Sequence, residues 1–153
     1  MRCARSPTRS PPFADSVAAV RAALSAAEAE GVPFVLNART DAFLLGEGRT
    51  DAEKTAEAIE RGRAYLAEGA VCVFVPGRLD EPTIEQLVAG LGERTLSVIG
   101  SPVSVAPARL QELGVARVSY GPWSQRVALT ALQETAAELY AGGGIPSGTR
   151  MLN

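Results

Sequence analysis

The sequence predicts an α/β fold with four parallel strands and helices between them. Short apolar segments alternate along the chain with segments whose apolar residues recur at helical spacing. Capping residues or glycines separate most of these segments. The chain has 153 residues, 46% of them hydrophobic, which is enough for one domain with a core. Such alternation is typical of right-handed strand–helix–strand units and a parallel sheet.

The expected order is one helix, then a strand followed by a helix four times. The first helix has its apolar residues on one side, with Asp15 as a candidate N-cap and Gly31 just past its end. Residues 33–36 follow as a short apolar run, which predicts a buried strand. The apolar residues of this helix are Val17, Val20, Leu24 and Ala27.

The second unit begins with a capping box, in which Thr50 and Glu53 cap each other's backbone amides. A helix is expected over residues 51–68, ending before Gly69. Residues 70–75 are apolar without alternation, which is typical of a strand covered on both faces. Asp80 then begins a third helix that ends before Gly92.

The last elements follow the same pattern. Strands are expected over residues 95–100 and 115–121, with a short helix over 106–113 between them. A final helix is expected over residues 124–141. Its apolar residues at helical spacing are Val127, Leu132, Ala136 and Leu139.

The composition excludes several classes of function. A net charge of -2 gives no basic surface for nucleic acid or an anionic membrane, and no apolar run is long enough to span a bilayer. The absence of histidine removes the commonest general base and zinc ligand. Cys3 lies in a proline- and arginine-rich segment, residues 1–12, that we expect to be a disordered tail, and Cys72 lies in an apolar run. We expect no disulfide between them, which fits the cytoplasm.

Polar residues follow each expected strand. Because ligands of parallel α/β folds bind beyond the carboxyl ends of the strands, these positions are the candidate site. Arg39 is the most informative, since its planar guanidinium suits bidentate binding of a carboxylate or phosphate. It could instead form an ion pair with Asp41 that only fixes the strand end. The residues at this edge include Asn37, Arg39, Asp41, Gly100, Ser101, Ser119 and Gly121.

The backbone amides after the third and fourth strands are candidate anion ligands. Gly100, Ser101 and Gly121 could present N–H groups to a phosphate or carboxylate, with helices beginning shortly after them. The alternative, which we favour, is that these glycines simply turn the chain. Neither loop has the spacing of a P-loop or a dinucleotide fingerprint. Cys72 is expected to be a buried structural thiol.

Three segments together resemble the isocitrate lyase / phosphoenolpyruvate mutase superfamily. They are "VPFVLNARTDAF", "AIERGRAYLAEGAVCVFVPG" and "LQELGVARVSYG", in this order. The resemblance implies a (β/α)8 barrel of the TIM type, of which this chain carries the C-terminal half: helix four and then strand–helix units five to eight, over residues 13–153. It implies a magnesium-dependent lyase or mutase that makes or breaks C–C or P–C bonds of small keto or hydroxy acids through an enolate. It also implies that Arg39 contacts the acidic group of the substrate.

The chain departs from the family pattern in two ways. The resemblance places the magnesium ligands and the mobile catalytic loop in the N-terminal half, so we expect no metal ligand and assign no catalytic residue here. The true lyases carry a glutamate after the proline that aligns with Pro76, where this chain has Gly77, and a polar motif with asparagine where it has Ile99, Gly100 and Ser101. The mutases carry a histidine near the end of strand six, and this chain has no histidine. A branch acting on oxaloacetate-like acids fits better than isocitrate, methylisocitrate or phosphonopyruvate chemistry.

Two hypotheses follow for the chain by itself. It is either a fragment of such an enzyme, with little or no activity alone, or a non-catalytic half-barrel that binds an anion or associates with a complementary half. An open parallel sheet leaves two unpaired edges and an apolar face, which predicts a homo-oligomer or other self-association. The expected small-molecule partner is a carboxylate substrate.

Overall fold

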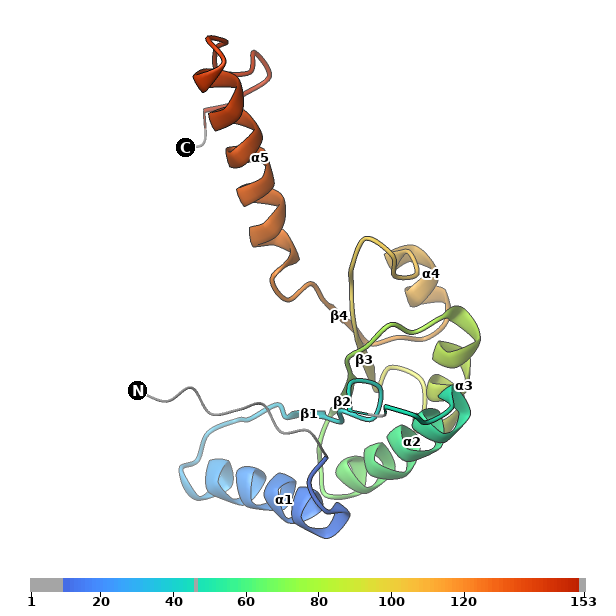
Figure 1. Cartoon of the computed structure of the whole chain (residues 1–153). Helices are drawn as coiled ribbons and strands as arrows, with labels where there is room; N and C mark the ends of the chain where they lie inside the picture. The colour runs from blue at the N-terminus through green and yellow to red at the C-terminus, as the bar shows by residue number, and fades with distance from the viewer. Residues whose placement is uncertain (1–9, 46, 152–153) are drawn as a thin grey trace. The chain divides into compact units, whose positions relative to one another are not determined.

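The computed structural model describes residues 10–45 and 47–151. It divides into two compact units, Met1–Ser119 and Tyr120–Asn153. The first unit contains a four-stranded parallel sheet in the order β1-β2-β3-β4, and Figure 1 labels its elements along the chain. The strands are β1 (Asn37–Arg39), β2 (Cys72–Val75), β3 (Leu96–Ile99) and β4 (Arg117–Ser119). This confirms the predicted α/β class with four parallel strands.

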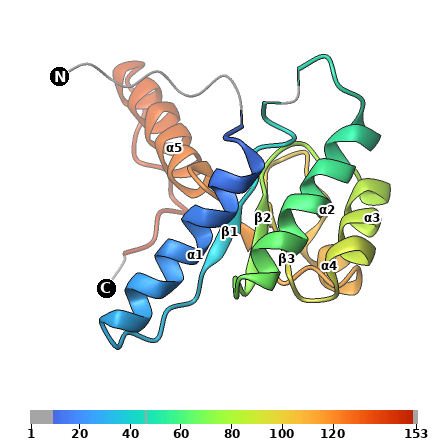
Figure 2. The ribbon, with the colours of Figure 1, turned by 90° about the horizontal axis from the view of Figure 1, so that it is seen from below.

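Four helices belong to the first unit. They are α1 (Phe13–Ala29), α2 (Asp51–Ala67), α3 (Glu81–Leu91) and α4 (Pro107–Glu112), and the last three connect successive strands. The main core lies between the sheet and these helices, where Val73, Val75 and Leu96 meet Leu87 and Leu110. A second cluster lies between β1 and the first two helices, and Figure 2 shows α1 running alongside β1. The helices therefore cover one face of the sheet.

Within the described part of the first unit, no helix covers the other face of the sheet (Figure 2), which is called the open face below. β2 alternates between buried and half-buried residues: Val73 and Val75 are buried, while Cys72 and Phe74 are half-buried. The expectation that residues 70–75 are covered on both faces is therefore wrong within the described part of the chain, and so is the expectation that Cys72 is buried. No helix of the first unit reaches this face, although the strand has the apolar sequence of a two-sided one.

The first strand lies later in the sequence than predicted. Residues 33–36 are not a strand, and the Val35 side chain is 72% exposed. The pairing begins at Asn37, which lies opposite Cys72. Pro33 has no N–H group to donate, and only the Leu36 carbonyl oxygen of this segment is bonded to the next strand segment, accepting from the Val71 N–H at 2.9 Å and the Cys72 N–H at 3.4 Å. Arg39 is consequently the last residue of β1 rather than part of the loop after it.

The local signals for the helix starts are mostly confirmed. Thr50 and Glu53 form the predicted capping box of α2, and the Asp80 side chain caps α3 by accepting from the Thr83 N–H. Asp15 is not the N-cap of α1; that position is Pro12, and Asp15 lies in the first turn. Hydrogen bonds from the Thr50 N–H and hydroxyl lower the pKa of Glu53, and hydrogen bonds from the Thr83 hydroxyl and N–H lower the pKa of Asp80. Residues 1–9 of the predicted tail lie outside the described residues.

The second unit contains one long helix, α5 (Trp123–Tyr140). It begins one residue before the predicted start and ends one residue before the predicted end. The Arg126 guanidinium lies over the Trp123 ring at 4.8 Å, which is a cation–π contact. None of its residues is buried. No helix in the described part of the chain is both long and apolar enough to cross a membrane.

A cluster of polar and charged residues joins the start of α1 to the middle of α2. The Arg61 guanidinium donates to Glu57 at 2.7 Å, to the Ser16 hydroxyl at 3.1 Å and to the Pro11 carbonyl at 3.0 Å. Arg49 also contacts the Glu57 carboxylate. Partial burial by itself would raise the pKa of Glu57, but hydrogen bonds from Arg49 and Arg61 outweigh it and hold that pKa below its ordinary value. These residues fix α1 against α2.

The lowered pKa of Glu57 predicts a loss of stability in acid. A carboxyl group whose pKa is lower in the folded state stabilises the fold above its unfolded pKa, about 4.3. This contribution is lost as the pH falls through the folded pKa. We expect the urea midpoint of the native chain to fall more steeply below about pH 4.5 than that of Glu57→Gln, which has no carboxylate to protonate. Denaturation curves recorded at several pH values check this, and parallel pH profiles would contradict it.

Gly77, in the loop after β2, has a conformation and a neighbour that exclude a side chain. Its φ is +147°, and a Cβ at this position would lie 2.7 Å from the Phe43 Cβ. We expect Gly77→Ala to lower the free energy of unfolding by about 1–3 kcal/mol, measured by urea denaturation. Gly144→Ala is the matched control, because a Cβ there meets nothing within 4 Å. Equal stability of the two variants would show that Phe43 moves aside without cost.

Candidate functional site

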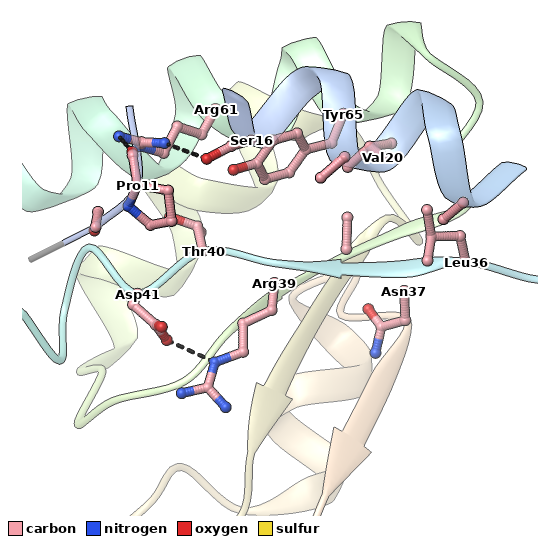
Figure 3. A pocket seen from close by; sticks show the side chains of 14 residues that line it. Pro11, Ser16, Val20, Leu36, Asn37, Arg39, Thr40, Asp41, Arg61 and Tyr65 are labelled. Carbon is pink, nitrogen blue, oxygen red and sulfur yellow. Dashed lines mark hydrogen bonds and ion pairs between the residues drawn. The ribbon is translucent and has the colours of Figure 1, made fainter. Parts of the chain in front are cut away.

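The candidate site begins at the carboxyl end of β1, where the strand continues directly into Thr40 and Asp41. Ala38 faces the helices and is buried beside Val20 and Tyr65. Asn37 and Arg39 are the neighbours of Ala38 in the strand, so they point to the open face. Figure 3 shows both side chains on the side of β1 away from the helices. Because side chains alternate between the two faces along β1, the Asn37 amide and the Arg39 guanidinium lie on the same face.

Arg39 and Asp41 form an ion pair. The Arg39 Nε donates to the Asp41 Oδ1 at 2.6 Å, and the dashed line in Figure 3 marks this bond. The Arg39 side chain is 53% exposed, and neither of its Nη groups has a partner among the described residues. The two alternatives for Arg39 are therefore compatible, because the ion pair uses only Nε and leaves the Nη edge open to a ligand.

A polar row crosses the open face from β1 to β4. The Asn37 Nδ2 donates to the Ser97 hydroxyl at 3.4 Å, and the Arg117 Nη1 donates to the same oxygen at 3.3 Å. Ser97 lies in the middle of β3 and is fully buried. The Asn37 Oδ1 atom is buried and accepts no hydrogen bond from the described residues. Sheet register brings these residues together although they are up to 80 positions apart in the sequence.

The backbone amides after β3 are already in use. The Gly100 N–H donates to the Ser119 carbonyl at 2.8 Å, and the Ser101 N–H donates to the Ser104 hydroxyl at 2.9 Å. The Ser104 hydroxyl in turn donates to the Ser101 carbonyl, which closes a tight turn. These bonds favour the turn interpretation of this loop over an anion site. Gly121 belongs to the second unit, where its φ of +49° also fits a turn.

A cavity of about 400 Å³ lies along the outer edge of β1. Figure 3 shows α1 and α2 on one side of it and β1 on the other. The Thr40 side chain, only 2% exposed, lines this cavity, and its Oγ1 has no hydrogen-bond partner among the described residues. Arg61 and Tyr65 line it from α2. The cavity is a groove between two helices and an unpaired strand edge.

The donor set of this site does not fit a magnesium ion. Magnesium is held by several carboxylate, carbonyl or water oxygens. Within residues 10–45 and 47–151 no three acidic, histidine or cysteine side chains lie close enough to hold a metal. Asp41 is the acid next to the site, and its Oδ1 is bound to Arg39. No chemical step can be assigned to a metal held by these residues.

Sequence reasoning missed Ser97, Arg117 and Thr40. Ser97 and Arg117 each lie inside an apolar run, where a lone polar residue is a signal for a special environment. Thr40 stands within the motif that was singled out, but its burial depends on α1, which no local pattern reveals. The contact of Ser97 with Asn37 depends on sheet register, which is a tertiary property.

Comparison with known proteins identifies the relatives of the chain. The family model described as phosphoenolpyruvate phosphomutase matches residues 4–140. A putative phosphonomutase from Burkholderia cenocepacia J2315 has a similar structure, with a TM-score of 0.76 and 31% identity over 84% of this chain and 52% of that one. No curated protein matches the chain.

Two further solved structures show the same fold. Oxaloacetate acetylhydrolase in complex with oxalate has a TM-score of 0.76 and 25% identity, over 93% of this chain and 49% of that one. The 2,3-dimethylmalate lyase has a TM-score of 0.71 and 23% identity, over 94% of this chain and 49% of that one, and so shows the fold alone. The chain spans about half the length of these TIM-barrel enzymes. It belongs to the phosphoenolpyruvate phosphomutase family, within the phosphoenolpyruvate mutase/isocitrate lyase superfamily.

Proposed function

We propose that this chain is one half of an enzyme that acts on C–C or P–C bonds of small keto or hydroxy carboxylic acids, and that Arg39 binds the substrate carboxylate. One observation carries the proposal. Arg39 ends β1 with its Nε held by Asp41 and its two Nη groups without partners among the described residues. A planar guanidinium in this state suits a carboxylate with two acceptor oxygens.

Asp41 has a positioning role in this proposal. Its backbone carbonyl accepts from the N–H groups of Leu44 and Leu45, both at 2.9 Å, which fixes the turn after β1. Its carboxylate then holds Nε, so that the Nη edge of the guanidinium stays available to a ligand on the open face. Asn37 lies two residues before Arg39 on the same face, and its Nδ2 group would donate a further hydrogen bond to the substrate carboxylate.

The small acid expected as the substrate resembles oxaloacetate. One relative with 25% identity is named oxaloacetate acetylhydrolase and was solved with its product oxalate. Oxalate is therefore a rational probe for the carboxylate site. We expect isothermal titration calorimetry to detect oxalate binding by the native chain. If circular dichroism shows that the chain is folded but calorimetry detects no heat of oxalate binding, the proposal is contradicted.

The chain by itself should be inactive. Members of the family use a divalent metal, and the described residues contain no cluster of three acidic, histidine or cysteine side chains that could hold one. We propose magnesium as the metal of the complete enzyme, supplied with its ligands by the other half. Pyruvate release from oxaloacetate in the presence of magnesium is the measurement. No release above the protein-free control is expected, and robust turnover would overturn the proposed inactivity.

The alternative is a half-barrel that binds an anion or a protein without catalysing a reaction. Both hypotheses place an anion at Arg39, so oxalate binding does not distinguish the non-catalytic half-barrel from the enzyme half. They differ once a complementary half is supplied, because only the enzyme half then gains activity. Self-association stays a prediction, supported by the unpaired edges of the sheet. A cytoplasmic location also stays a prediction, supported by the free thiol of Cys72.

A further inference from the structure

The Ser97 hydroxyl is the shared acceptor of the polar row on the open face. Its Oγ accepts from the Asn37 Nδ2 at 3.4 Å and from the Arg117 Nη1 at 3.3 Å. A hydroxyl oxygen has two lone pairs, so these two bonds use its whole capacity as an acceptor. Since β2 lies between β1 and β3 in the sheet, the Asn37 side chain reaches across β2 to meet Ser97.

Ser97 itself is out of reach of a ligand. Its neighbours Leu96 and Val98 belong to the core under the helices, so the Ser97 side chain points to the open face. It is nevertheless fully buried, with 0% of its surface exposed. Burying a hydroxyl costs free energy unless it is hydrogen-bonded, and its partners among the described residues are Asn37 and Arg117. Any effect of Ser97 on ligand binding must therefore pass through one of these two side chains.

The bond to Ser97 is the single hydrogen bond of the Asn37 side chain among the described residues. The Nδ2 group carries two hydrogens, so one remains for a ligand on the open face. The torsion that turns an asparagine amide is broad and roughly two-fold, so an unanchored amide presents its oxygen as readily as its nitrogen. An amide oxygen turned toward a carboxylate would repel it. The bond to Ser97 fixes the amide in one orientation, in which Nδ2 keeps a free hydrogen.

We propose that Ser97 is a positioning residue of the carboxylate site, and that its hydroxyl anchors the Asn37 amide so that the free Nδ2 hydrogen donates to the bound acid. The inference rests on the proposed function, because it needs a carboxylate held by Arg39. Arg117 holds the same oxygen from β4, so residues of three strands place one amide. An amide that is ordered before binding loses less conformational freedom when the ligand arrives.

Nuclear magnetic resonance of the Asn37 side chain tests the anchor directly. Asn37 is one of two asparagines in the chain, and its side-chain amide signals are those that Asn37→Ala removes. We expect oxalate to shift these signals in the native chain. In Ser97→Ala they should change position before oxalate is added, because the anchor is lost. Thr55→Val is the matched control and should leave them unchanged, since it removes a buried hydroxyl on α2 that donates to the Asp51 carbonyl.

The affinity for oxalate, measured by isothermal titration calorimetry, tests the consequence. Ser97→Ala should bind oxalate about threefold to tenfold more weakly than the native chain, because its amide must be ordered on binding. Asn37→Ala should bind about tenfold more weakly, through the loss of one hydrogen bond to a charged group. The double variant should bind like Asn37→Ala alone, because Ser97 acts through the amide that this variant lacks. A merely structural role of Ser97 would weaken binding again in the double variant.

Three outcomes overturn this inference alone, and in each of them the native chain still binds oxalate. One is a folded Ser97→Ala chain with native affinity, and another is a double variant that is weaker than Asn37→Ala by the factor that Ser97→Ala shows by itself. The third is a set of Asn37 signals that oxalate does not shift, a measurement that does not need Ser97→Ala to fold. Absence of oxalate binding by the native chain would instead reject the proposed function, and this inference with it.

Discussion

Replacing Arg39 by alanine should lower the affinity of the chain for oxalate by about 10–100-fold. Hydrogen bonds to charged groups contribute about 1.5–3 kcal/mol, and the Nη edge of Arg39 is the part of the site that faces the ligand. Arg39→Lys keeps the charge but loses the planar pair of donors, so its affinity should lie between those of the native chain and Arg39→Ala. Isothermal titration calorimetry measures the oxalate affinity of the native chain and of both variants.

The control for this experiment is Arg21→Ala. Arg21 lies on α1 and forms an ion pair with Glu68, so the substitution removes the same charge at a place away from the strand ends. Its affinity for oxalate should equal that of the native chain. If Arg21→Ala weakened binding as much as Arg39→Ala, the effect would come from net charge, and Arg39 would lose its assigned role.

The second large effect is expected for Arg61→Ala. This arginine is 9% exposed and holds together Glu57, Ser16 and the Pro11 carbonyl. Its removal leaves the partly buried Glu57 carboxylate with Arg49 as its remaining cation and leaves the other two acceptors without a donor. Breaking a buried ion pair from one side typically costs about 3–5 kcal/mol. Because Glu57 keeps Arg49, we expect a loss near the lower end, about 3 kcal/mol of unfolding free energy by urea denaturation.

Arg21→Ala serves again as the comparison. The Arg21 side chain is 65% exposed, and exposed ion pairs contribute about 0–1 kcal/mol. The two arginines thus differ in burial but not in type. A similar small loss for both variants would show that the contacts of Arg61 do not hold α1 against α2.

Two of the segments that resemble the family each contain an arginine, and these two arginines have different roles. Arg39 belongs to "NARTDAF" and points to the open face, whereas Arg61 belongs to "ERGRAYLAEGA" and joins two helices. The resemblance singled out both segments without separating these roles. Their contacts separate them, because the Nη groups of Arg39 have no partner among the described residues, whereas the Arg61 guanidinium already donates to Glu57, Ser16 and Pro11.

The sequence by itself determined the class of fold, the order of the elements and the family. Local signals explain this success: the capping box at Thr50, the cap at Asp80 and the apolar runs act within a few residues of the backbone that they fix. It also placed Arg39 at the carboxyl end of a strand. It placed the first strand four residues too early, since an apolar run does not reveal where its partner begins.

Only the tertiary structure decided the rest. Sheet register brought Asn37, Ser97 and Arg117 into one polar row, and the packing of α1 beside β1 formed the groove around Thr40. The structure also showed that the apolar strand β2 is covered on one face only. These features depend on contacts between residues far apart in the chain. Local propensity carries no information about such contacts, because pairing and burial are decided by what lies across the sheet.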